Sequence, residues 1–334
     1  MFRSIQLIAR KAYALRWAAP LSVAGVLAAC SDLPAPTSPA PATPPGSLEG
    51  GNRIVLPYTK IERILFSAHT DSSSRIFRVE PDGSNLAQVP TKGVAFAPSW
   101  SEDRKKITFT RPVFGIQKVM VMNADGSGLT QLVSGEYPRF RPDGTKIAFQ
   151  RSVNGGPPQI FTMDPDGTDV EQLTHNPHGA YWPSWSPGGE RIAYTAAAYD
   201  GGSEDLEIWW TNHSGLQQHQ ITSCNKLQGV RCAAADWGMV GTEQRLVYSV
   251  SPGTANVSQV RTSSWGGSDE TVVRSVPKVP GNKFPVWSRD GTRIAYFDKS
   301  NASADWPDIF IVNNDGTDHT RLTTMDVPKS RASW

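Results

Sequence analysis

The sequence predicts an all-β fold, namely a six-bladed β-propeller of four-stranded antiparallel blades, closed by the C-terminal strand joining the N-terminal blade. Three observations predict this fold. A unit of 40 to 52 residues recurs along the chain, each unit has short apolar stretches separated by Asp-Gly turns, and no segment keeps an apolar period of 3.6 residues over three turns. Units of this kind cannot bury their apolar faces alone, so they stack radially.

The repeat is clearest between Tyr137 and Thr174, and the segments that begin at Trp182 and Phe284 align with it as YPRFRPDGTKIAF, WPSWSPGGERIAY and FPVWSRDGTRIAY. One aromatic residue recurs in every copy, at spacings of 40, 45, 52, 50 and 47 residues. We call these six residues the anchor aromatics. They are Trp100, Phe140, Trp185, Trp237, Trp287 and Trp334.

Each copy contains four β-like stretches, which we name strands A to D in chain order. In the third copy we expect them at residues 137–140, 146–151, 159–164 and 170–174. Asp143-Gly144 separates the first two and Asp166-Gly167 the last two. Asp-Gly between apolar stretches predicts a tight hairpin turn, because glycine accepts the positive φ that such turns require.

The two ends of the repeat region complement each other. The first copy has expected strands at 63–68, 75–80 and 86–90, with no strand A before them, while residues 331–334 resemble a strand A with nothing after it. We expect 331–334 to pair beside 63–68. This closure would remove the free strand edges that otherwise promote aggregation.

The repeats PSWSPGGERIAY and RPDGTKIAF…QIFTMDPDGT resemble the WD40-like PD40 repeats of the TolB propeller, which are similar to those of prolyl-oligopeptidase and tricorn-type propellers. The resemblance covers residues 53–334 and implies the propeller fold. It does not define an activity, because many activities use this fold. TolB proteins have an α/β domain before the propeller, whereas a short proline-rich segment precedes it here. The resemblance therefore does not imply a partnership with Pal.

Residues 1–29 have the pattern of a lipoprotein signal peptide. Basic residues without acidic ones are followed by an apolar run of 13 residues, which is too short to span a bilayer. The run ends in LAAC at Cys30, which resembles the bacterial lipobox and implies lipidation of that cysteine. Ser31 after it resembles lipoproteins sent to the outer membrane. We therefore expect a lipid-anchored protein of the cell envelope, at the outer membrane, facing the periplasm or the cell surface.

The rest of the chain divides into residues 30–52, which hold the lipidated cysteine and a Pro/Ala/Ser-rich tether, and the propeller at 53–334. The 334 residues include 33 basic and 31 acidic ones, and four of the basic ones precede Cys30, which leaves 29 against 31 after processing. No basic excess remains to favour nucleic acid. The expected membrane contact is the lipid anchor only.

The two remaining cysteines, Cys224 and Cys232, have seven residues between them. In an oxidising compartment such a pair is expected to form a disulfide. The alternative is a metal pair, but no second pair and no nearby histidines at ligand spacing support it. We expect no cofactor.

The loops differ between the two faces of the predicted propeller. The A–B and C–D turns are short and regular, whereas the B–C and D–A loops are long and varied, as loops that carry function tend to be. A ligand is therefore expected on the irregular face, around the channel. Aromatic residues stand just before strand A there, either as a stacking platform for a sugar or a peptide side chain or as packing between blades. They are Phe96, Tyr137, Trp182 and Phe284.

Two further groups of polar residues lie in the predicted loops. His175 and His178 share one D–A loop and are either a metal pair or ordinary surface residues. Seven acidic residues are either Ca²⁺ ligands or solvated loop charge, and the absence of a recognised ligand spacing favours the second. The seven are Asp200, Glu204, Asp205, Glu207, Asp298, Asp305 and Asp308.

The sequence lacks the G-x-S-x-G and H-E-x-x-H motifs. It therefore predicts a non-catalytic propeller that binds an envelope protein or a glycan. The alternative, by analogy of fold, is a metal-dependent propeller enzyme, lactonase- or lyase-like, with its site at the channel mouth.

Overall fold

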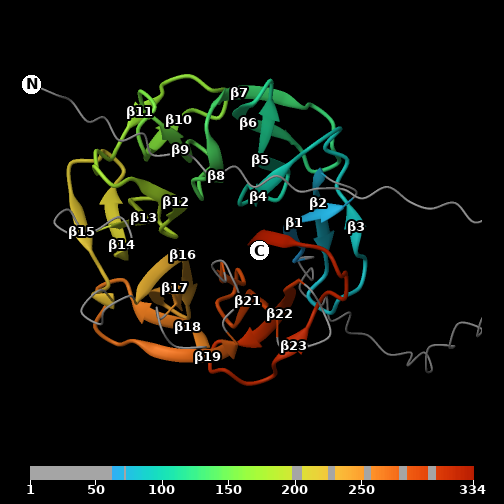
Figure 1. Ribbon diagram of the computed structural model, residues 1–334, viewed down its shortest axis with the longest axis vertical. Coiled ribbons are helices and arrows are strands. Elements are labelled where there is room, and N and C mark those ends of the chain that lie inside the picture. Colours follow the sequence, from blue (N-terminus) through green and yellow to red (C-terminus); the bar gives the residue numbers. More distant parts are fainter. Residues whose placement is uncertain are drawn as a thin grey trace, which may run out of the picture. The chain divides into compact units, whose positions relative to one another are not determined.

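The computed structural model describes residues 62–70, 73–197, 205–224, 230–251, 257–277, 284–299 and 306–334. These residues form six four-stranded antiparallel sheets, arranged radially about one axis (Figure 1). The predicted all-β, six-bladed propeller is confirmed. None of the described segments is a helix with the length and apolarity needed to cross a membrane. The predicted signal peptide, Cys30 and the tether lie outside the described residues.

We number the blades in chain order from β1, and each strand A is the innermost strand of its blade (Figure 1). Blade 1 consists of β24 (Lys329–Ser333), β1 (Ile64–Thr70), β2 (Ser73–Val79) and β3 (Ala87–Gln88). Blade 2 consists of β4 (Phe96–Trp100), β5 (Lys106–Val113), β6 (Ile116–Asn123) and β7 (Thr130–Ser134). Blade 3 consists of β8 (Glu136–Phe140), β9 (Ile147–Ser152), β10 (Pro158–Met163) and β11 (Glu171–Gln172).

The second half of the ring repeats this order. Blade 4 consists of β12 (Ala180–Trp185), β13 (Arg191–Ala197), β14 (Leu206–Asn212) and β15 (Gln218–Gln220). Blade 5 consists of β16 (Arg231–Val240), β17 (Glu243–Ser251), β18 (Val257–Ser264) and β19 (Thr271–Pro277). Blade 6 consists of β20 (Val286–Trp287), β21 (Arg293–Asp298), β22 (Asp308–Asn313) and β23 (Thr320–Arg321).

The C-terminal strand closes the ring, as predicted. β24 pairs with β1, with Leu65 opposite Ser333 and Ala68 opposite Lys329. The strand begins two residues earlier than the expected 331–334. Trp334 is 9% exposed and packs in the cluster that joins blades 1 and 6.

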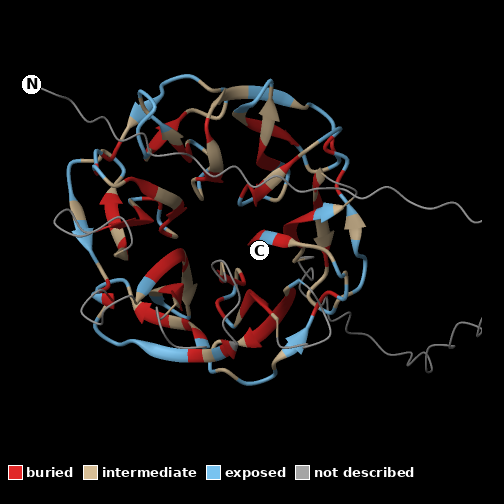
Figure 2. Cartoon of the chain, in the orientation of Figure 1, coloured by how far each residue is buried: buried red, intermediate tan, exposed pale blue. Residues whose placement is uncertain are grey.

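The apolar core lies between neighbouring blades. Buried residues gather on the inner and middle strands, whereas exposed residues gather on the outer strands and loops (Figure 2). All six anchor aromatics are buried, with exposed fractions between 4% and 9%. Each strand A is an edge strand that faces the axis, and such a strand tolerates a residue without an N–H, as Pro98, Pro138 and Pro183 show.

A backbone bend recurs three residues before each anchor aromatic, where φ is positive, between 42° and 57°. In blades 1 to 5 the A–B pairing changes register there, as a β-bulge does. In four blades the N–H of this residue donates to a side chain on strand B of the preceding blade, such as Ala97 to Ser67 Oγ at 2.9 Å. We call these six residues the bend residues. They are Ala97, Tyr137, Trp182, Ala234, Phe284 and Arg331.

The hairpin turns form as the Asp-Gly pairs predict. Asp166 Oδ1 accepts the N–H and the hydroxyl of Thr168 at 2.9 and 2.7 Å, and Gly167 has a φ of 92°. The outer strand of that blade is shorter than the expected 170–174. The hydroxyl oxygen of Thr174 accepts the N–H of Ile160 at 2.9 Å, so a side chain replaces the next backbone hydrogen bond between β10 and β11.

Candidate functional site

A cavity of about 370 Å³ lies on the propeller axis, at the end that carries the A–B turns. We call it the axial cavity. All six anchor aromatics line it. The A–B turns contribute Pro142, Pro187 and Arg289, which places its opening on the regular face rather than on the irregular face where the loop pattern predicted a ligand.

The residue just before each anchor aromatic points to the axis, because side chains alternate along a strand. In five blades this residue lines the axial cavity, and its counterpart in blade 6 is Val286. The five are Ser99, Arg139, Ser184, Asp236 and Ser333. Ten of the residues that line the cavity are therefore polar or charged, and six are the anchor aromatics.

Asp236 is held in place by its neighbours on both sides. Its Oδ1 accepts the hydroxyl of Ser184 at 2.9 Å, and its Oδ2 accepts the N–H of Trp287 at 3.0 Å. The Ser184 oxygen in turn accepts the N–H of Trp237 at 3.2 Å. Both carboxylate oxygens of Asp236 are thus occupied by neutral donors, which link blades 4, 5 and 6.

Arg139, in contrast to Asp236, has few hydrogen-bond partners. It is 9% exposed, and within the described part of the chain its guanidinium makes one hydrogen bond, from Nη2 to the Ala332 carbonyl at 3.4 Å. No ion pair within 4.0 Å involves it among these residues. Burial lowers the pKa of Arg139, and the charge of Asp236 partly offsets this effect. Most of its donors therefore face the cavity without a partner.

The two other guanidinium groups that line the cavity have partners. Arg289 of blade 6 forms an ion pair with Glu102 of blade 2 and donates to its carbonyl at 2.9 Å, so the contact spans blade 1. Arg104 donates to the Arg63 carbonyl at 3.2 Å and lies 5.5 Å from the centre of the Trp100 ring.

The four aromatics that the sequence singled out lie together at the opposite end of the axis, and each is half-buried. Ring centroids are 6.3 Å apart for Phe96 and Tyr137, 6.5 Å for Tyr137 and Trp182, and 5.4 Å for Trp182 and Phe284. We call this group the aromatic cluster. Three of its members are bend residues, whereas Phe96 precedes the bend residue of blade 2 by one position.

Arg331, the bend residue of blade 1, completes the aromatic cluster. Its guanidinium lies 5.4 Å from the ring centres of both Tyr137 and Phe284. Burial places the pKa of Arg331 well below its usual range, and the charge of Arg139 lowers it further. The rings thus pack on each other and on Arg331. Their role as a stacking platform for a ligand stays a prediction.

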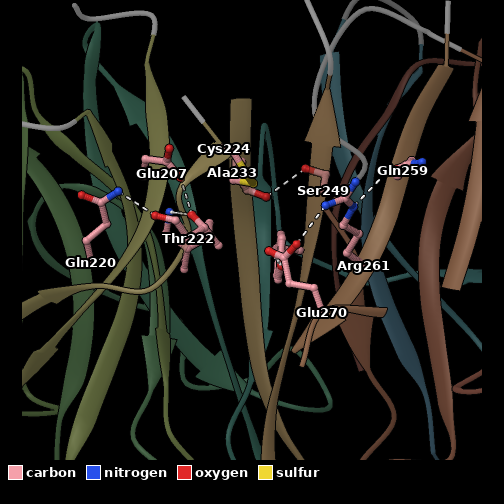
Figure 3. The surroundings of a disulfide bond; sticks show 12 residues. Glu207, Gln220, Thr222, Cys224, Ala233, Ser249, Gln259, Arg261 and Glu270 are labelled. Atoms are coloured by element: carbon pink, nitrogen blue, oxygen red, sulfur yellow. Dashed lines mark hydrogen bonds and ion pairs between the residues drawn. A yellow bond between two sulfur atoms is a disulfide. The ribbon is translucent and has the colours of Figure 1, made fainter. Parts of the chain in front are cut away.

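Cys224 and Cys232 are joined in a disulfide with their Cα atoms 6.0 Å apart, at the junction of blades 4 and 5 (Figure 3). Within the described residues, the one group of His, Cys, Asp and Glu whose potential ligand atoms come together consists of these two cysteines and Glu207. Sulfur atoms bonded to each other offer no thiolate to a metal. Glu207 instead accepts the hydroxyl of Thr222 (Figure 3).

The expectation of solvated loop charge is wrong for three of the acidic residues. Glu207, Asp298 and Asp308 are buried, because they lie in β14, β21 and β22 rather than in loops. Asp308 accepts Arg321, Lys329 and the hydroxyl of Thr323. Three of the others, Asp200, Glu204 and Asp305, lie outside the described residues.

The two histidines belong to the surface of one D–A loop. His175 is exposed, and His178 contacts its neighbours through its backbone, with its N–H bonded to Asn176 and its carbonyl to the Tyr181 hydroxyl. The loop is held by Asn176, which is buried and donates to the Ala197 carbonyl at 2.9 Å.

Sequence reasoning missed Arg139 and Asp236. The sequence did mark them as unusual. Both occupy the position just before an anchor aromatic, where the aligned repeats have serine in three other blades. The anchors fix the strand register, so this position had to face the axis.

Comparisons with known proteins identify the repeat. The family model described as the TolB beta propeller domain matches residues 62–240. The chain is 32% identical over 143 residues to the Protein TolB homolog of Chlorobium luteolum, covering 41% of this chain and 32% of that protein. It is 38% identical over 68 residues to the Uncharacterized peptidase YuxL of Bacillus subtilis, covering 20% of this chain and 10% of that protein.

The structural comparison agrees in fold. TolB from Acinetobacter baumannii superimposes with a TM-score of 0.68 at 17% identity, over 82% of this chain and 66% of that one. The matches to the curated relatives span less than half of those proteins' lengths.

Proposed function

Because the chain belongs to the TolB β-propeller domain family, we propose that it is a non-catalytic binding protein of the cell envelope, anchored by a lipid on Cys30, which holds an envelope protein or glycan at its axial cavity. The observation that carries the proposal is the cavity itself. It is a concave site lined by six aromatic residues and ten polar or charged ones, and ligand sites are typically concave and largely preformed.

The chemistry of the cavity supports binding over catalysis. Its carboxylates belong to Glu102 and Asp236, and both are already occupied by other groups. A general acid or base needs a free position beside its substrate. A metal-dependent enzyme is the alternative, and it predicts a tightly held divalent ion in the purified protein, which elemental analysis detects.

Three variants test the place of binding. Ser99→Phe fills the axial cavity, Trp182→Ala opens the aromatic cluster, and Asp166→Ala alters a C–D turn outside both. Each is immobilised, and the partners captured from envelope extracts are identified by mass spectrometry. We expect Ser99→Phe alone to lose a partner that the native protein captures. Loss with Trp182→Ala instead would move the site to the aromatic cluster, and retention by all three would overturn the proposal.

The anchor is tested separately. Cys30→Ser removes the acceptor for the lipid, so the protein should stay unprocessed or leave the detergent phase during phase partitioning. Normal processing together with unchanged partitioning would contradict the lipid anchor.

A further inference from the structure

We propose that the axial cavity recognises a carboxylate and that Arg139 is the residue that binds it. This inference rests on the proposed function, because it names the chemistry of the ligand that the cavity would hold. No relative named above supplies it. It follows from the one guanidinium lining the cavity that, within the described part of the chain, has neither an ion pair nor an aromatic ring against it and makes a single hydrogen bond, of 3.4 Å.

The first step is the cost of the unpaired charge. Burying a charged group without a counter-ion is strongly unfavourable, and structures normally pair it. Arg139 is nine-tenths buried and has a single long hydrogen bond to a backbone carbonyl, so its donors are available to an anion that enters the cavity. An anion in the cavity would form the charge-assisted hydrogen bonds that these donors lack within the protein.

The second step is that, among the described residues that line the cavity, no carboxylate lies within ion-pair distance of Arg139. Asp236 is close enough to influence its pKa, but both of its oxygens are bonded to Ser184 and the Trp287 backbone. Glu102 is committed to Arg289 at the rim. The carboxylates of the cavity are therefore committed elsewhere.

A second guanidinium group lies near Arg139. The charge of Arg139 lowers the pKa of Arg331, and the rings of Tyr137 and Phe284 cover the Arg331 guanidinium. Aromatic faces stabilise a cation but do not remove its charge. The repulsion between the two guanidinium groups favours an anion bound beside Arg139.

A carboxylate fits better than a phosphate. The guanidinium group presents parallel N–H donors that match the two oxygens of a planar carboxylate. A phosphate would place two negative charges near Asp236 with one free guanidinium to balance them. The volume of about 370 Å³ is at the small end of ligand pockets and suits one sugar ring or about two amino-acid residues. The carboxylate therefore belongs to an acidic sugar or to a peptide.

Two matched ligand pairs test the inference by calorimetry on the purified propeller. D-galacturonate and D-galactose differ in the carboxylate of a sugar, and N-acetyl-alanyl-alanine and its amide differ in the carboxylate of a peptide. We expect the charged member of one pair to bind at least about tenfold more tightly than its neutral counterpart. This is the difference in affinity expected when a ligand gains hydrogen bonds to a charged group. The pair that responds identifies the source of the carboxylate.

Variants assign the effect to one residue. Arg139→Gln should reduce binding of the charged ligand to the level of the neutral one, and Arg139→Lys should restore part of it by charge alone. The matched control is Arg141→Gln, which lies two residues further along the chain, outside the cavity, and bonds to the Gly189 carbonyl. A melting curve of each variant establishes that it is folded.

The outcomes separate the two proposals. Equal affinity for charged and neutral ligands, binding of neither pair, or undiminished binding in folded Arg139→Gln would overturn the carboxylate inference. If Ser99→Phe still abolished partner capture in those cases, the proposal that the axial cavity binds a partner would remain valid without carboxylate recognition. If Ser99→Phe captured its partner normally while the charged ligand bound through Arg139, the proposed function would fail and the carboxylate site would remain.

Discussion

The six bend residues explain how one position can carry side chains as different as alanine, tryptophan and arginine. Their backbone is held from outside, since a side chain of the preceding blade accepts the N–H in four of the six, for example Thr195 that of Ala234 at 3.0 Å. A positive φ costs a residue other than glycine on the order of 1 kcal/mol, and the interblade contact offsets this cost. The side chain itself is then free to vary, and it fills the axis differently in each blade.

Asp269 gives the first prediction, because its pKa is about 2, well below its ordinary value of 3.8. The backbone N–H of Ser264 and then the guanidinium of Arg245, 2.7 Å away, favour its charged form. A carboxylate with a depressed pKa stabilises the fold above pH 3.8, and this contribution is lost as the pH falls towards 2. Asp269→Asn should therefore lower the melting temperature at pH 7, with the difference vanishing near pH 2.

The control for this prediction is Glu243→Gln. Glu243 is exposed and lies 3.8 Å from the same Arg245, so the pair is expected to contribute little. Melting curves between pH 2 and 7 compare the three proteins. A destabilisation by Asp269→Asn that stayed constant down to pH 2 would show that its cause is not the ionised carboxylate.

The second prediction concerns the connection between β15 and β16, which the disulfide closes. A closed loop of about nine residues stabilises the fold by about 2–3 kcal/mol in the chain-entropy model. Replacing Cys224 and Cys232 together by serine should lower the melting temperature, and reductant should lower that of the native protein but not that of the variant. Mass spectrometry of the protein purified without reductant should find no alkylated thiol at either position. Two freely alkylated thiols would contradict the bond.

The hairpin turns were predictable because a few neighbouring residues specify each of them. The ends of the outer strands were less predictable, because side chains there compete with the backbone for the same hydrogen bonds. Asp166-Gly167 specifies its turn within four residues, whereas β11 ends where the Thr174 hydroxyl replaces a backbone acceptor. Loop length favours the opposite end of the axis and therefore does not predict the cavity. Its position depends instead on which side chains fill the axis, and the bulky bend residues fill the end that the loops favoured.

At the scale of the whole molecule, closure gives the third prediction. Deleting residues 331–334 removes Trp334 from a cluster that contains Ile64 and Val286 and uncovers the edge of β1. Loss of a buried tryptophan side chain costs about 3–5 kcal/mol, a large part of a typical domain stability. The truncated protein should melt at a much lower temperature and aggregate.

Trp265→Ala is the matched control, because Trp265 is 42% exposed in the outer part of blade 5 and its loss should matter far less. Calorimetry and size-exclusion chromatography measure both variants. A truncated protein that kept its melting temperature and eluted as the native one does would refute the importance of the closing strand.

The pairing of Leu65 with Ser333 also fixes an order of events during biosynthesis. Blades 2 to 6 are each built from one continuous stretch of chain and can form as soon as that stretch is available. Blade 1 must wait, with three strands and an open edge, until residues 329–333 have been synthesised. Contacts this distant in sequence form slowly, and partly folded chains with open edges aggregate. The newly made chain is therefore vulnerable to aggregation until β24 has been synthesised, and a factor that shields the edge of β1 during that interval would raise the yield of native protein.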